Sequence, residues 1–580
     1  MYNIFKDYID ETTNNKYTQD NTSLTNSVIW NKLYKFQKDG VLGALEKLEK
    51  YNGCIIADSV GLGKTFEALA IIKYYESINA RVLVLCPKKL RDNWIMYKGN
   101  DVRNILSEDR LRYDVLNHTD LTRKSGFSGD INLKTFNWSN YDLVVIDESH
   151  NFRNGGSRNS NNRYDKLMND IIKMGIPTKV LLLSATPVNN QLNDLKHQIN
   201  LITEENDKHI EHEGIRSINF TLKSTQQAFN EWSKLPEDQR SLNEFLDLIN
   251  YDYFKLLDIF TIARSRKHIE KYYTTNDIGK FPNRKKPITI KSKIDTPNKF
   301  PSISEIAKQI SMLNLSAYSP IEYILPECLY KYKKYDFLDL DKNLSLKQSD
   351  REKGLLKLIR TNLLKRLESS IYSLQLTLER TLFRIDETIN GLTESKEKFI
   401  LNLEINERDI DLEDDSDEYI RKNSMEINFK DIDIDRWIND LQEDKLVIQK
   451  LLSETNQINA SRDAKLKELK ELLEHKIKNP INDGNKKVIV FTAFADTAKY
   501  LYENLEEWLI SNYGIRSGLI IGSGNNETNR TNTKNDINEI LMHFSPISKS
   551  RDSIQPESSL EIDVLIATDC ISEGQNLQDC

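Results

Sequence analysis

The sequence predicts an α/β protein with two parallel-sheet domains and a large α-helical insertion between them. Short β-branched runs alternate with helical stretches over residues 81–190 and again over residues 486–568. Such alternation is typical of a parallel sheet with crossover helices. Between residues 204 and 460 the strand signal fades, and apolar residues recur at helical steps of three or four. At 580 residues the chain is also too long for one hydrophobic core.

The second α/β domain is predicted from three apolar runs and one helix. Residues 486–492, 518–521 and 562–568 are expected to be strands, and residues 496–508 a helix. We therefore divide the chain into an N-terminal extension, a first α/β domain, a helical linker with a basic crossover, a helical insertion and a second α/β domain. Their expected boundaries are 1–30, 31–203, 204–295, 296–460 and 461–580.

A glycine-rich turn in the first α/β domain predicts a phosphate-binding loop. It follows an apolar run at residues 53–57 and leads into a helical pattern at Phe66. Gly61 and Gly63 allow successive backbone N–H groups to converge on phosphate oxygens at the start of the helix. Lys64 would reach the β- and γ-phosphates, and the Thr65 hydroxyl would ligate magnesium. The loop consists of Asp58, Ser59, Val60, Gly61, Leu62, Gly63, Lys64 and Thr65, with Asp58 where the strict pattern has glycine.

Three further apolar runs end in polar residues. The runs at residues 81–86, 141–146 and 178–183 lead into residues 87–94, 147–150 and 184–187. Ligands of an open α/β sheet bind beyond the carboxyl ends of its strands, so these polar tips are expected beside the phosphate loop. Asp147 would hold the magnesium that bridges the triphosphate. Glu148 would orient and deprotonate the attacking water.

These motifs resemble helicase superfamily two, in which Asp147-Glu148-Ser149-His150 corresponds to the second motif and Ser184-Ala185-Thr186 to the third. Residues 33–41 look like the adenine-recognising segment, with Gln37 as the matching residue. Residues 569–577 are similar to the fifth motif, which contacts the nucleic-acid backbone and the nucleotide. The resemblance implies two RecA-like P-loop domains, ATP and Mg²⁺ as cofactors, and coupling roles for a set of residues in these motifs. That set is His150, Ser184, Thr186, Glu573 and Gly574.

The phosphate loop looks most like that of the sucrose-non-fermenting (Snf) type of translocase, which moves along double-stranded DNA. Ser59 and Ser149 depart from the usual glutamate and from the usual alanine or glycine, and neither change removes a catalytic group. Residues 87–94 and 365–370 look like the bacterial branch associated with restriction and phage defence. Double-stranded DNA is then the expected partner, together with a nuclease or other defence subunit. An RNA-dependent ATPase and a nucleotide-gated scaffold with little turnover remain the alternatives.

The helical middle of the chain carries one long pattern and two charged stretches. Apolar spacing over residues 356–392 predicts a single helix of about 55 Å, packed in a hairpin with residues 434–452. A plain helical bundle without nucleic-acid contact explains the same pattern. Residues 264–293 hold ten Lys or Arg against two acidic residues, which is typical of either a solvated face or a phosphate-binding surface. Residues 404–418 hold nine acidic residues against one arginine, which predicts a disordered loop.

Composition excludes several other classes. No apolar run approaches the ~20 residues of a membrane helix, and the amino terminus lacks a secretory segment, so a cytoplasmic protein without a membrane partner is expected. Five cysteines without a C-x-x-C pair indicate neither a disulfide framework nor a zinc site. The net charge of −7 neither supports nor excludes DNA binding, which would need local basic patches.

The chain stops at Cys580, directly after the fifth motif. By the resemblance, the next motif would carry arginines that stabilise charge on the γ-phosphate, and such a finger raises rates about 10³- to 10⁵-fold in related chemistry. We therefore expect a truncated second domain with an unpaired sheet edge. This chain is expected to bind ATP with magnesium and to hydrolyse it poorly.

Overall fold

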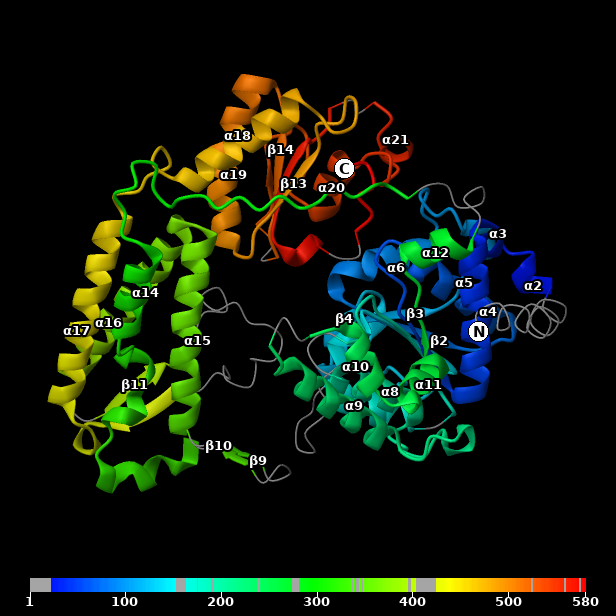
Figure 1. Cartoon of the computed structure of the whole chain (residues 1–580), viewed down its shortest axis with the longest axis horizontal. Helices are drawn as coiled ribbons and strands as arrows, with labels where there is room; N and C mark the ends of the chain where they lie inside the picture. Colours follow the sequence, from blue (N-terminus) through cyan, green and yellow to red (C-terminus); the bar gives the residue numbers. More distant parts are fainter. Residues whose placement is uncertain are drawn as a thin grey trace. The chain divides into compact units, whose positions relative to one another are not determined.

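The computed structural model divides into two compact units, Met1–Lys286 and Pro287–Cys580 (Figure 1). The residues it describes are 22–152, 163–174, 176–188, 192–236, 240–273, 281–335, 337–339, 344–346, 348–394, 398–402, 424–522, 525–557, 560–572 and 575–580. The predicted acidic loop at residues 404–418 and the fifth-motif residues Glu573 and Gly574 lie outside them.

The first unit is built around a six-stranded parallel sheet, as predicted. Its strand order is β3-β2-β6-β7-β1-β8. The strands are β1 (Gly53–Ile56), β2 (Val82–Cys86), β3 (Asp114–Asn117), β6 (Leu143–Asp147), β7 (Lys179–Leu183) and β8 (Thr261–Ile262). The runs predicted at residues 81–86, 141–146 and 178–183 are therefore β2, β6 and β7. The last strand, β8, falls where the sequence predicted helix only.

Helices cover both faces of this sheet, because alternate residues of each buried strand point to opposite sides. Cys54 and Ile56 belong to the core beneath α4 and α5, whereas Ile55 belongs to the core beneath α8, α9 and α11. Helices of the first face are α2 (Thr22–Thr25), α3 (Val28–Lys32), α4 (Lys35–Tyr51), α5 (Lys64–Ser77) and α6 (Arg91–Lys98). The remaining helices of the unit are α7 (Arg163–Lys166), α8 (Leu192–Thr203), α9 (Ile218–Ser233), α10 (Leu242–Leu248), α11 (Tyr251–Phe260) and α12 (Arg266–Tyr272). A two-residue hairpin pair, β4 (Phe127–Ser128) and β5 (Ile131–Asn132), stands apart from the sheet.

The second unit begins with a helical bundle in place of the predicted single long helix. The prediction of one helix over residues 356–392 is wrong, since α15 (Gln348–Ser369) and α16 (Ile371–Glu394) are separated at Ser370. Both helices contact the turn Ser316–Tyr318, and they lie side by side (Figure 1). The Ser370 hydroxyl accepts the N–H of Ser373, as an N-cap does, and also bonds Thr497. These contacts override the continuous apolar pattern.

The predicted partner of this hairpin is confirmed. Helix α17 (Ile434–Thr455) packs along α16 and shares one core with α14 (Ile303–Met312) and α15. Two short antiparallel pairs complete the region. They are β9 (Phe337–Asp339) with β10 (Leu344–Leu346), and β11 (Lys398–Asn402) with β12 (Ser424–Asn428).

The second α/β sheet has the order β13-β16-β14-β15, with the first three strands parallel. Its predicted strands and its predicted helix are confirmed. The elements are β13 (Val488–Phe491), β14 (Ser517–Ile520), β15 (Glu527–Thr528), β16 (Val564–Ala567), α18 (Ala464–Lys478), α19 (Ala495–Tyr513), α20 (Ile537–Phe544) and α21 (Arg551–Ile554). Helices α18 and α19 cover one face and α20 the other. Among the described strands, β13 pairs with β16 alone, and its Phe491 is 48% exposed.

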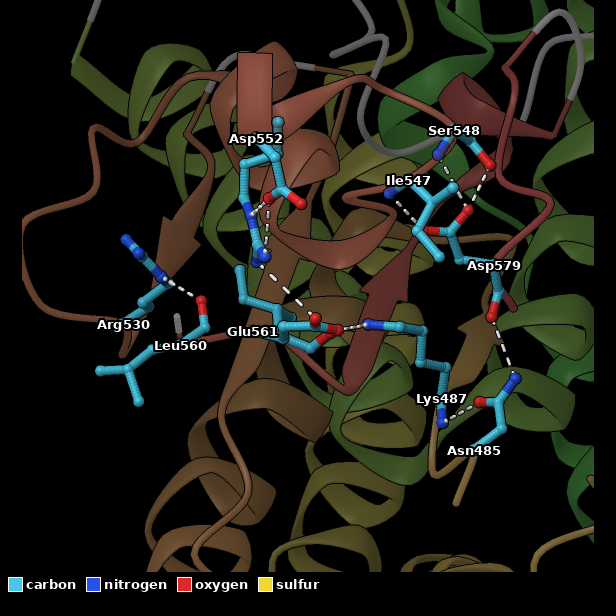
Figure 2. Close-up of polar contacts among 11 residues, drawn as sticks. Asn485, Lys487, Arg530, Ile547, Ser548, Asp552, Leu560, Glu561 and Asp579 are labelled. Carbon is cyan, nitrogen blue, oxygen red and sulfur yellow. Dashed lines mark hydrogen bonds and ion pairs between the residues drawn. The ribbon is translucent and has the colours of Figure 1, made fainter. Parts of the chain in front are cut away.

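Side chains tie the helical bundle to this sheet domain. Arg366, which is 1% exposed, donates to Asp496 over 2.8 Å and lies over the Phe494 ring. At the other end of the domain, Asp579 accepts the N–H groups of Ile547 and Ser548 (Figure 2). Each unit therefore contains a parallel α/β sheet as predicted, and the predicted helical insertion is the bundle of the second unit. No helix within the described ranges is long and apolar enough to cross a membrane.

Candidate nucleotide site

The phosphate loop joins β1 to α5 with the backbone geometry that its glycines predict. Gly61 and Gly63 have φ angles of 82° and 86°, in the left-handed region that favours glycine. A Cβ atom on Gly63 would meet Nε2 of Gln37, so a side chain there would displace the Gln37 amide from the loop. Lys64 opens α5, and its Nζ donates to the carbonyl of Asp58 over 3.0 Å.

Gln37 lies on α4 directly against this loop. Its amide donates to the Leu62 carbonyl and accepts the Tyr34 N–H, each over 2.9 Å, and the residue is 6% exposed. One amide hydrogen and one lone pair remain after these two bonds, which is enough to recognise an adenine edge. The adenine role stays a prediction.

Strand register brings the second and third motifs to the phosphate loop. Asp147 pairs with Leu183, which in turn pairs with Ile56. The second motif, the third motif and the phosphate loop therefore all begin at the same edge of the sheet. This is the carboxyl edge, where open α/β sheets bind ligands. The sequence prediction of a shared rim is confirmed for Asp147, Ser184 and the loop.

Asp147 is held by a hydrogen bond that the sequence did not reveal. The indole Nε1 of Trp94 donates to its Oδ2 over 2.9 Å, and the Glu148 N–H donates to its Oδ1 over 3.0 Å. Burial raises the pKa of Asp147 to about 6, and these two donors oppose that shift. Trp94 was part of the predicted tip at residues 87–94, but it had no assigned role. Because Trp94 lies on α6 and Asp147 ends β6, only the fold brings them together.

Glu148 occupies a strained backbone position beside His150. Its φ of 49° is left-handed, which is uncommon for a residue with a long side chain. Its Oε2 lies 3.3 Å from Nδ1 of His150, and that nitrogen is 3.3 Å from the Ser184 hydroxyl. The same hydroxyl accepts the Thr186 N–H over 3.2 Å. The predicted coupling residues of the second and third motifs thus form one chain of contacts that begins at Glu148, and their coupling role stays a prediction.

Ser149, one of the two departures from the family pattern, has a structural partner. Its hydroxyl donates to Oε1 of Gln198 over 2.8 Å, and Nε2 of Gln198 donates to the Pro187 carbonyl over 2.7 Å. Ser149 and Gln198 are fully buried. The serine therefore adds a second link between the segments after β6 and β7.

Asp58 and Arg264 form an ion pair that sequence reasoning missed. The Arg264 guanidinium contacts both carboxylate oxygens of Asp58 and also reaches Glu67. Asp58 is fully buried and Arg264 is 9% exposed. The expectation that Arg264 lies on a solvated or phosphate-facing surface is therefore wrong, because its charge is neutralised inside the first unit. The sequence held one signal of this pair. Asp58 directly follows an apolar run, at the position where the strict pattern has glycine, and a buried carboxylate there needs a cation as its partner.

The residues around the loop fit a magnesium nucleotide. Mg²⁺ is usually held by one or two protein oxygens together with substrate phosphates and water. Thr65, at the start of α5, and Asp147, at the end of β6, remain the predicted oxygen ligands of the magnesium. The described ranges contain no group of three or more His, Cys, Asp or Glu residues that could hold a metal ion.

Known proteins with similar sequences share this part of the chain. Residues 36–212 match the family model described as the SNF2-related domain. The uncharacterized ATP-dependent helicase YqhH of Bacillus subtilis (strain 168) is 31% identical over 167 residues, which are 27% of this chain and 28% of that protein. The Caenorhabditis elegans homologue of the SWI/SNF-related matrix-associated actin-dependent regulator of chromatin subfamily A-like protein 1 is 28% identical over 203 residues, 31% of this chain and 26% of that protein. The chain thus spans about a quarter of the length of these relatives.

Two solved structures align over most of the chain at low similarity. The Sulfolobus solfataricus SWI2/SNF2 ATPase core in complex with dsDNA is 14% identical, with a TM-score of 0.29, and the alignment covers 93% of this chain and 78% of that one. The Pyrococcus furiosus Hef helicase domain is 15% identical, with a TM-score of 0.35, over 94% and 88% of the two chains. The fold assignment rests on strand order and register. By sequence, the match to the SNF2-related domain model covers the residues that contain the phosphate loop, Asp147 and Glu148.

Proposed function

We propose that this chain is an ATP-dependent motor of the Snf type, which hydrolyses ATP and translocates along double-stranded DNA. The observation that carries the proposal is the shared carboxyl edge of β1, β6 and β7, where the phosphate loop, Asp147 and Glu148 meet. The match of residues 36–212 to the SNF2-related domain supports the same assignment.

We assign each residue of the site one role in ATP hydrolysis. The loop N–H groups and Lys64 would bind the β- and γ-phosphates, and Thr65 and Asp147 would hold the magnesium, which would neutralise charge on the phosphates. Glu148 orients the attacking water and accepts its proton. His150, 3.3 Å from the Glu148 carboxylate, passes a change at that carboxylate to Ser184 and Thr186.

Glu148→Gln tests the catalytic assignment. The amide retains the size of the side chain but cannot accept the proton, so single-turnover hydrolysis should fall about 10²- to 10⁴-fold while Mg-ATP affinity stays within about twofold. Glu108→Gln, at an exposed position of the same unit, is the matched control and should behave like the unaltered chain. Binding is followed with a fluorescent ATP analogue. Turnover that survives Glu148→Gln would show that another group is the base.

Stimulation by nucleic acid separates the proposal from its alternatives. Hydrolysis should respond to duplex DNA more than to single strands or RNA. A larger response to RNA would favour an RNA-dependent ATPase, and Mg-ATP binding with no stimulated turnover would favour a nucleotide-gated scaffold. We further propose a cytoplasmic role in bacterial restriction or phage defence with a nuclease or other defence subunit as partner, which the resemblance of residues 87–94 and 365–370 supports.

A further inference from the structure

The phosphate loop is paired along its first residues with the segment at residues 261–272, which we call the crossover segment. Strand β8 pairs with β1 in parallel, and the hydrogen bonds continue past the end of the strands. Ala57 N–H donates to the Ile262 carbonyl over 2.6 Å, and Ser59 N–H donates to the Arg264 carbonyl over 3.0 Å. The start of the loop is therefore held as a sheet extension.

The Arg264 side chain fastens this extension to the elements around the nucleotide. Its Nε lies 3.0 Å from each carboxylate oxygen of Asp58, and its Nη2 lies 2.5 Å from Oε1 of Glu67 on α5. Its Nη1 donates to the Phe36 carbonyl, next to Gln37 on α4. A Cβ atom on Gly40 would lie 2.4 Å from Nη2, so the glycine makes room for the guanidinium. One cation thus contacts the loop, the helix after it and the helix that carries Gln37.

Asp58 and Glu67 are both fully buried, and the guanidinium of Arg264 forms an ion pair with each of them. Burial raises the pKa of Glu67, and the Arg264 charge opposes that shift. Removing one partner of a buried ion pair leaves an uncompensated charge and is far more costly than the pair itself is stabilising. The position of Asp58 is consequently tied to the position of Arg264.

The helical part of the crossover segment also packs on the loop. Ile269 of α12 forms a small buried cluster with Leu62 of the loop and Phe36 of α4. Arg266 donates from Nη2 to the Val60 carbonyl over 3.3 Å. Residues 60 and 62 of the loop therefore cannot move without changing their contacts with α12.

From these contacts we propose that the crossover segment responds to nucleotide occupancy and that Arg264 is the positioning residue that transmits the response. Phosphate binding aligns the loop N–H groups, Arg264 carries the new position of Asp58 to the segment that leads into α12, and the packing of Ile269 on Leu62 keeps α12 against the loop. Helix α12 lies shortly before Lys286, where the first unit ends. The inference rests on the proposed nucleotide binding. It assigns a mechanical role to a segment whose charge had suggested only a solvated or DNA-facing surface.

Hydrogen exchange of the full chain, with and without a nonhydrolysable ATP analogue and Mg²⁺, tests the proposal. In the unaltered chain, amides of α5 and of α12 should both exchange at least about fivefold more slowly when nucleotide is bound. Asp58→Asn should weaken analogue binding about tenfold and, at saturating analogue, keep the protection of α5 while losing that of α12. Glu67→Gln is the matched control, because it removes the other fully buried carboxylate from the same guanidinium without altering the loop. It should retain the protection of α12.

Each outcome decides one question. An unaltered chain that does not bind the analogue refutes the proposed function itself. Binding with no change in α12 overturns the relay alone, and so do equal effects of Asp58→Asn and Glu67→Gln. If Asp58→Asn does not fold, Arg264→Lys takes its place, since lysine keeps the charge but cannot contact all three partners. Protection of α12 that persists in a folded Arg264→Lys variant likewise overturns the relay.

Discussion

Replacing Trp94 by phenylalanine removes one hydrogen bond from the carboxylate of Asp147 and leaves most of the aromatic contact in place. The lost bond spans 2.9 Å between Nε1 and Oδ2, and Trp94 is 1% exposed, so water has little access to replace it. A hydrogen bond to a charged group contributes about 1.5–3 kcal/mol. We therefore expect the apparent affinity for Mg²⁺ in the presence of ATP to fall roughly 10- to 150-fold, because the carboxylate is less well oriented and less readily ionised.

The assay is a magnesium titration of fluorescent ATP-analogue binding. Metal-free nucleotide binding should change by less than about twofold, since the loop is untouched. Tyr113→Phe is the matched control, because the Tyr113 hydroxyl donates to the Trp94 carbonyl over 2.6 Å without contacting Asp147. An unchanged magnesium affinity in Trp94→Phe, or an equal loss in Tyr113→Phe, would refute a positioning role for the indole.

Two further predictions concern the second unit. Arg366→Met removes the 2.8 Å ion pair with Asp496 and leaves the longer one, from Arg380 at 3.4 Å. The free energy of unfolding measured by urea titration should therefore fall by about 1–3 kcal/mol. Lys357→Met, on the exposed face of α15, is the control and should have no measurable effect. An unchanged midpoint would mean that Arg366 does not fasten the bundle to the sheet domain. Burial raises the pKa of Glu352 to about 8, so the folded state binds the extra proton and stability should fall by a few kcal/mol as pH rises from about 5 to 8. Glu352→Gln should flatten that pH dependence in urea titrations, and an unaltered slope would contradict the assignment.

The elements that sequence reasoning predicted correctly are those with strong local patterns. The runs that became β2, β6 and β7 are continuously apolar because both faces of their sheet are covered. Their polar ends follow from the parallel arrangement, which brings every carboxyl end to one edge. The positions of Asp147 and Ser184 beside the phosphate loop could therefore be predicted without knowing any side-chain contact.

The features that escaped prediction depend on contacts between distant residues. Arg264 lies 206 positions from Asp58, and its charge looks the same in the sequence as that of the exposed lysines after it. Trp94 reaches Asp147 across 53 positions, and an indole is usually explained by packing alone. The break at Ser370 combines a local cap on the Ser373 N–H with a hydrogen bond to the distant Thr497, and the continuous apolar pattern concealed it. Local propensity was outweighed in each case by tertiary contacts.

The pairing of β8 with β1 has a consequence for how the protein is made. Chains fold from the amino terminus as they leave the ribosome, at about 5–20 residues per second, and contacts between distant residues form late. The whole segment from Gly53 to Leu183 that forms the central strands emerges long before residues 261–264. Until then, the carboxylates of Asp58 and Glu67 lack their cation, and the edge of β1 lacks its neighbour. Nascent chains should accordingly become able to retain nucleotide only after Arg264 has emerged, well beyond the residue at which the SNF2-related domain match ends.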